Sequence, residues 1–195
     1  MGKGRLEAFS DGVIAIIITI MVLELKVPHG TNEAVDVEAL KGLKGVFGSY
    51  VLSFVFVAIY WNNHHHMLHA SERVTGGILW ANVHLLFWLS LVPFVTAWMG
   101  ENDFPPVPVA CYGGVMFMCG VAFNVLARML ARLHGPQSTL ARALGRDSKG
   151  WTSLVLYGSS IPLAFVDRWI SLGIYVLVAC MWLIPDRRIE RITTH

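Results

Sequence analysis

Charged side chains are scarce in this sequence of 195 residues. Asp, Glu, Lys and Arg make up 14% of the chain, against about a quarter in a typical soluble domain, while 55% of the residues are hydrophobic. This composition argues strongly against a water-soluble globular protein. The net charge of +2 is also too small to predict a nucleic-acid partner. Six helices of about 20 residues would use roughly 120 residues and leave the rest for ends and loops. The length and composition therefore predict one all-α integral membrane domain, residues 1-195, with six transmembrane helices.

The sequence also lacks the short motifs of familiar catalytic and ion-selective sites. It contains no G-x-S-x-G, H-E-x-x-H or Walker A pattern, which argues against an enzyme. It contains no T-V-G-Y-G, the filter sequence of ordinary potassium channels. The cysteines, Cys111, Cys119 and Cys180, lie inside apolar runs, so we expect packing residues and no disulfide. We predict no cofactor and no resident metal.

Six apolar runs predict the membrane spans. The last apolar stretch, from Trp151 to Ile184, is too long for one helix and is divided at Asp167 and Arg168. We therefore expect two short spans joined by a tight turn there, with a re-entrant hairpin as the alternative. The predicted spans are residues 8-26, 45-67, 77-99, 107-130, 151-167 and 168-185.

Basic residues are distributed unevenly between the two sides that these spans define. Six spans place both termini on one side, together with most of the 15 Lys and Arg residues. Since cytoplasmic loops carry the excess of Lys and Arg, we expect both termini in the cytoplasm. The opposite side keeps only Lys26, Lys41, Lys44 and Arg168.

Polar side chains occur where the first three spans reach the cytoplasmic side. Ser10 and Asp11 interrupt an apolar helix, and they could simply cap its start while Arg5 extends to the interface. Ionisable groups at such a position more often pair inside a bundle. A hydrogen-bonded network that holds the first helix is therefore our prediction, and it would join Ser10 and Asp11 to Asn63, His64 or His65, and Asn82.

The histidines after Asn63 permit a second reading. His65 and His69 are spaced i,i+4, and His66 and His69 are spaced i,i+3, as metal ligands on one helix face often are. However, no Cys or clear carboxylate stands beside them in the sequence. A proton-coupled or metal-ion transporter that uses the cluster from His64 to His69 is the alternative function.

The first span also carries a continuous apolar stripe. At about 100° per residue, Ile16, Ile20 and Leu23 share one side of the helix with Thr19 at the edge, and Asp11 projects elsewhere. Spacing alone fits a lipid-facing or core-facing surface as well as a pore.

Five sequence blocks resemble a known family. Arg5-x-x-x-Phe9-Ser10-Asp11 is similar to the R-x-x-x-F-S-D hallmark of the lysosomal and endosomal potassium channel family and its bacterial homologues. The end of the second span and the third span also resemble that family's pattern. The residues of those blocks are Trp61-x-Asn63-His64, Leu79-Trp80-x-Asn82, Leu91-Val92-Pro93-Phe94 and Gly100-Glu101.

The resemblance implies a potassium channel of modest selectivity over sodium, without a re-entrant filter. It implies a homotetramer of six-helix subunits in a prokaryotic cell membrane, with the first helices around a central pore and K+ as the permeant ion. Large side chains on the first helix would form the constriction. By position after the motif, they would be Ile16, Thr19, Ile20 and Leu23.

Overall fold

The structure is a computed structural model that describes residues 2–26, 42–138, 140–141 and 148–183. In these ranges the regular elements are all helices. With α4 and α5 counted as one broken helix, the described part contains the six helices that the composition predicts. The helices are α1 (Lys3–Leu23), α3 (Lys44–His69), α4 (Gly76–Ser90), α5 (Val92–Glu101), α6 (Pro106–His134), α8 (Ser148–Leu163) and α9 (Arg168–Leu183).

The helices differ in whether they are long enough to cross a bilayer. α1, α3, the α4–α5 pair and α6 contain 21 to 29 residues and are apolar enough to span a membrane. At 1.5 Å per residue, each covers the hydrocarbon core of about 30 Å. α8 and α9 contain 16 residues each, which corresponds to only about 24 Å. The prediction that both cross the membrane therefore stays a prediction.

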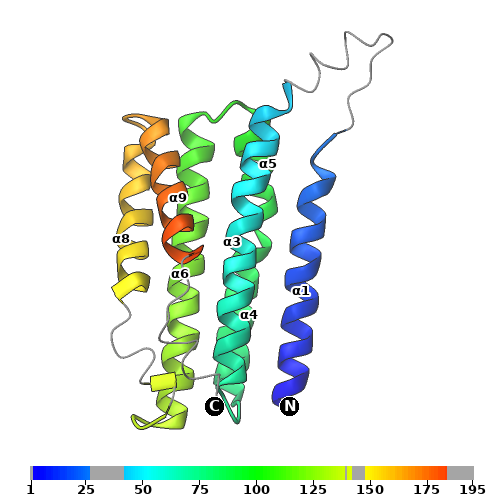
Figure 1. The fold of residues 1–195 in the computed structure, drawn as a ribbon, viewed down its shortest axis with the longest axis vertical. Coiled ribbons are helices and arrows are strands. Elements are labelled where there is room, and N and C mark those ends of the chain that lie inside the picture. The colour runs from blue at the N-terminus through cyan, green and yellow to red at the C-terminus, as the bar shows by residue number, and fades with distance from the viewer. Residues whose placement is uncertain (1, 27–41, 139, 142–147, 184–195) are drawn as a thin grey trace.

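The third span is broken rather than continuous. The sequence predicts one helix over 77-99, but the structure ends α4 at Ser90 and begins α5 at Val92, with Leu91 between them. Pro93 causes this break because it has no N–H to donate to the preceding turn and its ring crowds that turn. The two parts still run in nearly the same direction (Figure 1).

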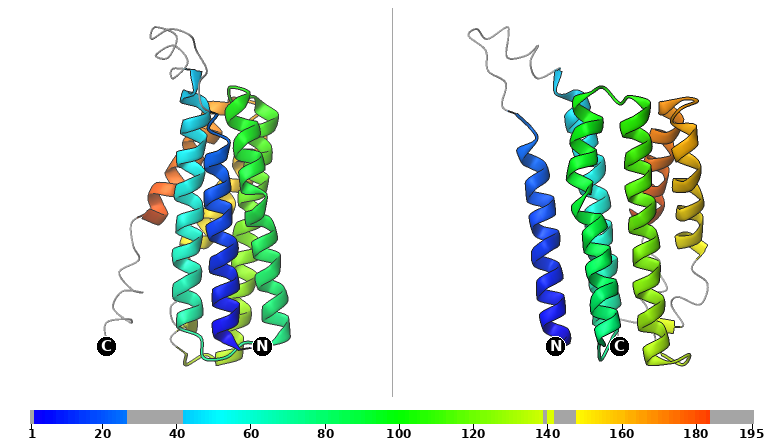
Figure 2. Two further views of the ribbon diagram at one scale, coloured as in Figure 1. Left: turned by 90° about the vertical axis from the view of Figure 1, so that its right-hand side faces the viewer. Right: turned by 180° about the vertical axis from the view of Figure 1, so that it is seen from behind.

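The helices form a bundle with α1 at one side. α3 and the α4–α5 pair stand upright together, α6 lies next to them, and α8 and α9 lie on the far side of α6 (Figures 1 and 2). α1 lies at the opposite edge from α8 and is covered on one side only. Its N-terminal end lies level with the turn that joins α3 to α4. The polar ends of the first three spans are thus at the same end of the bundle.

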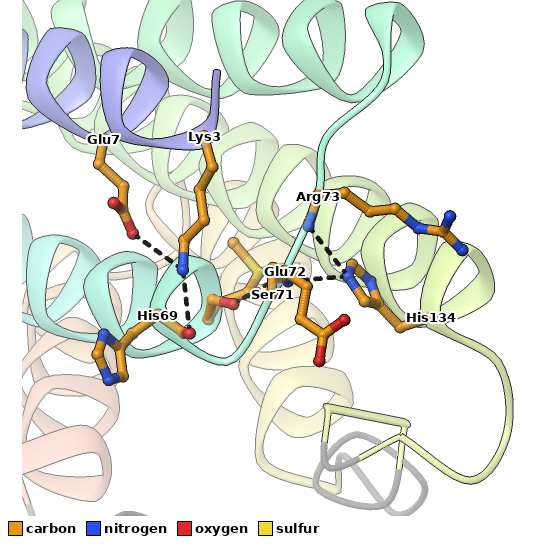
Figure 3. A network of polar contacts seen from close by, with 8 residues as sticks. Lys3, Glu7, His69, Ser71, Glu72, Arg73 and His134 are labelled. Atoms are coloured by element: carbon orange, nitrogen blue, oxygen red, sulfur yellow. Dashed lines mark hydrogen bonds and ion pairs between the residues drawn. The ribbon is translucent and has the colours of Figure 1, made fainter. Parts of the chain in front are cut away.

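Polar contacts join three segments at that end (Figure 3). Lys3 Nζ donates to the carbonyl oxygen of His69 at 3.1 Å and lies 3.7 Å from a Glu7 carboxylate oxygen. His134 Nε2 accepts from the backbone N–H groups of Glu72 and Arg73 at 3.0 and 3.4 Å. The start of α1, the α3–α4 turn and the end of α6 are therefore tied together.

The charge asymmetry is visible only in part. Lys3 and Arg73 lie at the end of the bundle where α1 begins. Lys26 and Arg168 lie at the opposite end, where α5 ends and α6 begins. There Lys26 contacts Glu101, and Arg168 contacts the backbone carbonyls of residues 103 and 104. The remaining basic residues of the prediction include several outside the described residues. These are Lys41, Arg142, Arg146, Arg187, Arg188 and Arg191.

Close packing between α6, α8 and α9 depends on a small residue. The Tyr175 hydroxyl donates to the Val109 carbonyl oxygen at 2.8 Å and accepts a hydrogen bond from Ser160 Oγ at 3.2 Å. A Cβ atom at Gly113 would overlap that tyrosine hydroxyl and lie 2.8 Å from Ser160 Oγ. Gly114, the next residue, has open space where a Cβ atom would stand.

Gly113→Ala should lower the free energy of unfolding by about 1 to 3 kcal/mol, because the methyl group forces apart a buried, hydrogen-bonded contact. Gly114→Ala is the matched control and should unfold close to the wild-type temperature. Thermal unfolding of the purified protein in detergent measures both. Equal unfolding temperatures for the two variants would show that α6 and α9 do not pack as described.

Candidate functional site

α1 has a covered face and an exposed face. The covered face packs on the rest of the chain, and its buried residues are Leu6, Ser10, Ile14, Ile17 and Met21. The residues expected to form a constriction all lie on the other face. Ile16 is 57% exposed, Ile20 43% and Leu23 74%, and Thr19 is also exposed. We call Phe9, Ile16, Thr19, Ile20 and Leu23 the exposed stripe of α1.

A chain of three buried polar side chains fixes the covered face of α1. Asn82 Nδ2 on α4 donates to Ser10 Oγ on α1 at 2.9 Å, and Asn82 Oδ1 lies 2.7 Å from His64 Nε2 on α3. The Ser10 hydroxyl donates its proton to the Leu6 carbonyl oxygen at 2.8 Å, so its oxygen accepts the hydrogen bond from Asn82. Because Asn82 Oδ1 can only accept, the His64 Nε2 nitrogen carries a proton. We call Ser10, Asn82 and His64 the anchor chain.

The anchor chain is costly to break. All three side chains are at most 1% exposed, and a buried polar group that loses its partner costs about 1 to 3 kcal/mol. Each residue also comes from a different helix, namely α1, α4 and α3. A rotation of α1 by one residue, about 100°, would carry Ser10 away from Asn82. The anchor chain therefore sets the rotation of α1 about its axis.

Asp11 makes a separate contact. The indole N–H of Trp61 on α3 donates to Asp11 Oδ1 at 3.0 Å, and the Trp61 ring is 44% exposed. The predicted network is thus divided, since Ser10 belongs to the buried anchor chain and Asp11 pairs at its edge. Both contacts attach the same turn of α1 to α3 and α4.

Other residues of the predicted network lie apart from it. Asn63 donates to the Ile59 carbonyl of its own helix at 2.8 Å and borders a cavity of about 40 Å³ between α3, α6, α8 and α9. Trp80 is 75% exposed, and Arg5 and Phe9 are exposed on α1. Of the alternatives Asn63, His64 and His65, the structure places His64 in the inward position, and Asn63 projects elsewhere because one residue along a helix changes direction by about 100°.

The histidines do not form a metal centre in the described part of the chain. His65 was a candidate for the network, but its ring stacks between Trp61 and His69, with centroids 6.0 Å apart in each case. His64 is held by Asn82 on another face of α3. No group of three or more His, Cys, Asp or Glu residues is arranged for a metal ion among the residues that the structure describes. The arrangement of these histidines therefore does not support the alternative function of a metal-ion or proton-coupled transporter.

A groove between α1 and α5 was not predicted from the sequence. It has a volume of about 820 Å³, and its walls include Ile16, Ile20 and Glu24 on one side and Phe94, Trp98 and Glu101 on the other. Lys26 Nζ lies 2.8 Å from Oε1 of Glu101, one of the residues that line the groove. The signal for this pair was present, since the first and third spans end on the same predicted side with opposite charges.

Comparisons with known proteins agree with this arrangement. The family model of the endosomal/lysosomal potassium channel TMEM175 matches residues 5–93, which contain α1 from Arg5 onward, the anchor chain and Trp61. A potassium channel of Chryseobacterium sp. (strain P1-3) is 49% identical over 191 residues, which cover 98% of this chain and 97% of that protein. The human endosomal/lysosomal proton channel TMEM175 is 26% identical over 210 residues, which cover 94% of this chain and 41% of that protein.

A solved structure shows the same fold. The crystal structure of a lysosomal potassium-selective channel TMEM175 homologue from Chamaesiphon minutus superposes with a TM-score of 0.82 at 29% identity, covering 93% of this chain and 96% of that one. These relatives are ion channels and not enzymes. Together with the apolar helices, they show that this chain is a membrane protein. The chain belongs to the family of the endosomal/lysosomal potassium channel TMEM175.

Proposed function

We propose that this protein is a weakly selective potassium channel of the cell membrane, built as a homotetramer with both termini in the cytoplasm. The α1 helices of four subunits surround a central pore, and Ile16, Thr19, Ile20 and Leu23 form its narrow part. The observation that carries this proposal is the exposed stripe of α1. It places large apolar side chains on the one side of α1 that its own subunit leaves uncovered. The named relatives support potassium as the permeant ion.

The exposed stripe gives the proposed pore a gate. Rings of isoleucine and leucine side chains exclude water when the pore is narrow and admit hydrated cations when it widens. Ile16 and Ile20 stand about one turn apart along α1, so two such rings would follow each other. A small outward movement of α1 would open both.

Thr19 supplies the polar group beside these rings. Its hydroxyl donates to the backbone carbonyls of Ala15 and Ile16, both at 3.0 Å. A hydroxyl that donates its proton in a hydrogen bond keeps its oxygen lone pairs as acceptors. Four such oxygens would face a partly hydrated cation without the complete carbonyl cage of an ordinary filter, which fits a modest preference for potassium.

The anchor chain gives the proposed gate its orientation. It lies on the covered face of α1, and the exposed stripe lies on the other side of the same helix. Fixing Ser10 therefore fixes the direction in which Ile16 projects. The role of Ser10, Asn82 and His64 is positional, and no ion needs to touch them.

Ile16→Asn should increase K+ flux about tenfold, because a polar side chain removes much of the dewetting barrier and each 1.4 kcal/mol changes a rate by that factor. Liposomes that contain the purified protein and an outward K+ gradient provide the measurement. Ile170→Asn is the matched control, since Ile170 on α9 is also apolar and 46% exposed. Its flux should equal that of the wild type.

Two results would contradict the proposal. An absence of K+ flux through the wild-type protein under all voltages and gradients would remove the channel function. Equal flux for Ile16→Asn, Ile170→Asn and the wild type would remove Ile16 from the pore while leaving conduction itself in place.

Asn82→Ala should lower the free energy of unfolding by about 2 to 4 kcal/mol, because it leaves Ser10 Oγ and His64 Nε2 buried without their shared partner. Asn62→Ala, at an exposed position of α3, is the control and should change stability little. Thermal unfolding in detergent and K+ flux in liposomes are the readouts. If Asn82→Ala unfolds and conducts like Asn62→Ala, the anchor chain does not position α1.

A further inference from the structure

Glu24 lies at the far end of the exposed stripe. It is the residue that caps the C-terminal end of α1, and its φ of −73° and ψ of −15° continue the helical path. It follows Ile20 by four residues and Ile16 by eight, so it projects within about 40 to 80° of both. The structure agrees, because Glu24 lines the same groove as Ile16 and Ile20.

The carboxylate of Glu24 interacts unfavourably with the dipole of α1. The C-terminal end of a helix carries a partial negative charge of about half an elementary charge, which favours Lys, Arg or His there and disfavours Glu. α1 has no basic residue in its last turn. Glu24 therefore adds to the negative potential of the helix end instead of cancelling it. A residue that opposes the local rule is a candidate for function.

The basic residue nearest to Glu24 in the sequence, Lys26, pairs with a different carboxylate. Lys26 Nζ binds Glu101 Oε1 at 2.8 Å. That hydrogen bond and the charge of Glu101 raise the pKa of the Lys26 ammonium, and the charge of Glu24 contributes less than either. Within the described part of the chain Glu24 makes no ion pair of its own. Lys26 thus pairs with Glu101 and acts on the charge of Glu24 more weakly.

We propose that Glu24 concentrates monovalent cations at the mouth of the pore next to Leu23 and thereby sets the conductance at low salt. This inference rests on the proposed function, because Glu24 side chains and α1 C-terminal ends of four subunits meet only if α1 lines a tetrameric pore. Charges of one sign around a narrow entrance raise the local concentration of counter-ions. Salt weakens the effect, since the Debye length falls from about 10 Å at 0.1 M to about 3 Å at 1 M.

Single-channel currents of Glu24→Gln in planar bilayers test the proposal. In about 20 mM KCl, the variant should carry about threefold less current than the wild type for K+ that enters from the Glu24 end. In about 1 M KCl the difference should shrink below about 1.3-fold because salt screens the carboxylates. Current in the reverse direction should change less. A purely structural role for Glu24 would not depend on salt or direction.

Glu72→Gln is the matched control, because it removes the same charge from the α3–α4 turn at the other end of the bundle. It should leave the low-salt current for entry from the Glu24 end unchanged. If Glu24→Gln conducts like the wild type at about 20 mM while Ile16→Asn alters flux, the inference is overturned and the channel proposal stands. If neither variant differs from the wild type, the proposed pore itself is wrong.

Lys26→Gln provides an independent arm if Glu24→Gln does not assemble. It leaves Glu101 unneutralised at the same mouth, so the low-salt current should rise by about twofold. An unchanged low-salt current in Lys26→Gln would overturn the inference.

Discussion

The hydrogen-bond chain from Ser10 through Asn82 to His64 is the constraint on which the rest of the site depends. It connects α1 to α4 and α3 through three fully buried side chains. α1 is otherwise covered on one face only and lies at the edge of the bundle. Without a fixed rotation, its apolar exposed stripe could face lipid, the subunit or a pore with little difference in free energy. The anchor chain removes that freedom.

The two ends of α1 are held in different ways. Near its start, buried polar contacts and the Trp61–Asp11 hydrogen bond resist rotation. Near its end, the buried apolar side chains of Ile17 and Met21 pack on the bundle, an exposed ion pair joins Lys26 to Glu101, and a groove lies between α1 and α5. The far half of α1, which contains the proposed rings, is thus held by apolar packing and an exposed ion pair, whereas the first half is held by buried hydrogen bonds.

The sequence was most informative where a chemical requirement is strong. Scarce charge and long apolar runs predicted the helices. Ser10 and Asp11 were predicted to meet Asn82 and one or more of Asn63, His64 and His65, because polar groups in a membrane need partners. It could not tell Asn63 from His64 or His65 as the inward residue, since that depends on the rotation of α3 by about 100°. The break at Leu91 was also missed, although its cause, Pro93, is a local signal in the sequence. The α1–α5 groove was missed because it arises from tertiary packing around Phe94 and Trp98.

Accessibility of Leu23 to water tests the central claim, that the exposed stripe of α1 lines an ion pathway, most directly. Leu23→Cys would be placed in a chain whose natural cysteines, Cys111, Cys119 and Cys180, are replaced by Ala. A charged, water-soluble thiol reagent should then block the K+ current, and it should not block the same cysteine-free chain without the new thiol. A current that persists, with the Leu23→Cys thiol modified only by a lipid-soluble reagent, would show that this face of α1 contacts lipid.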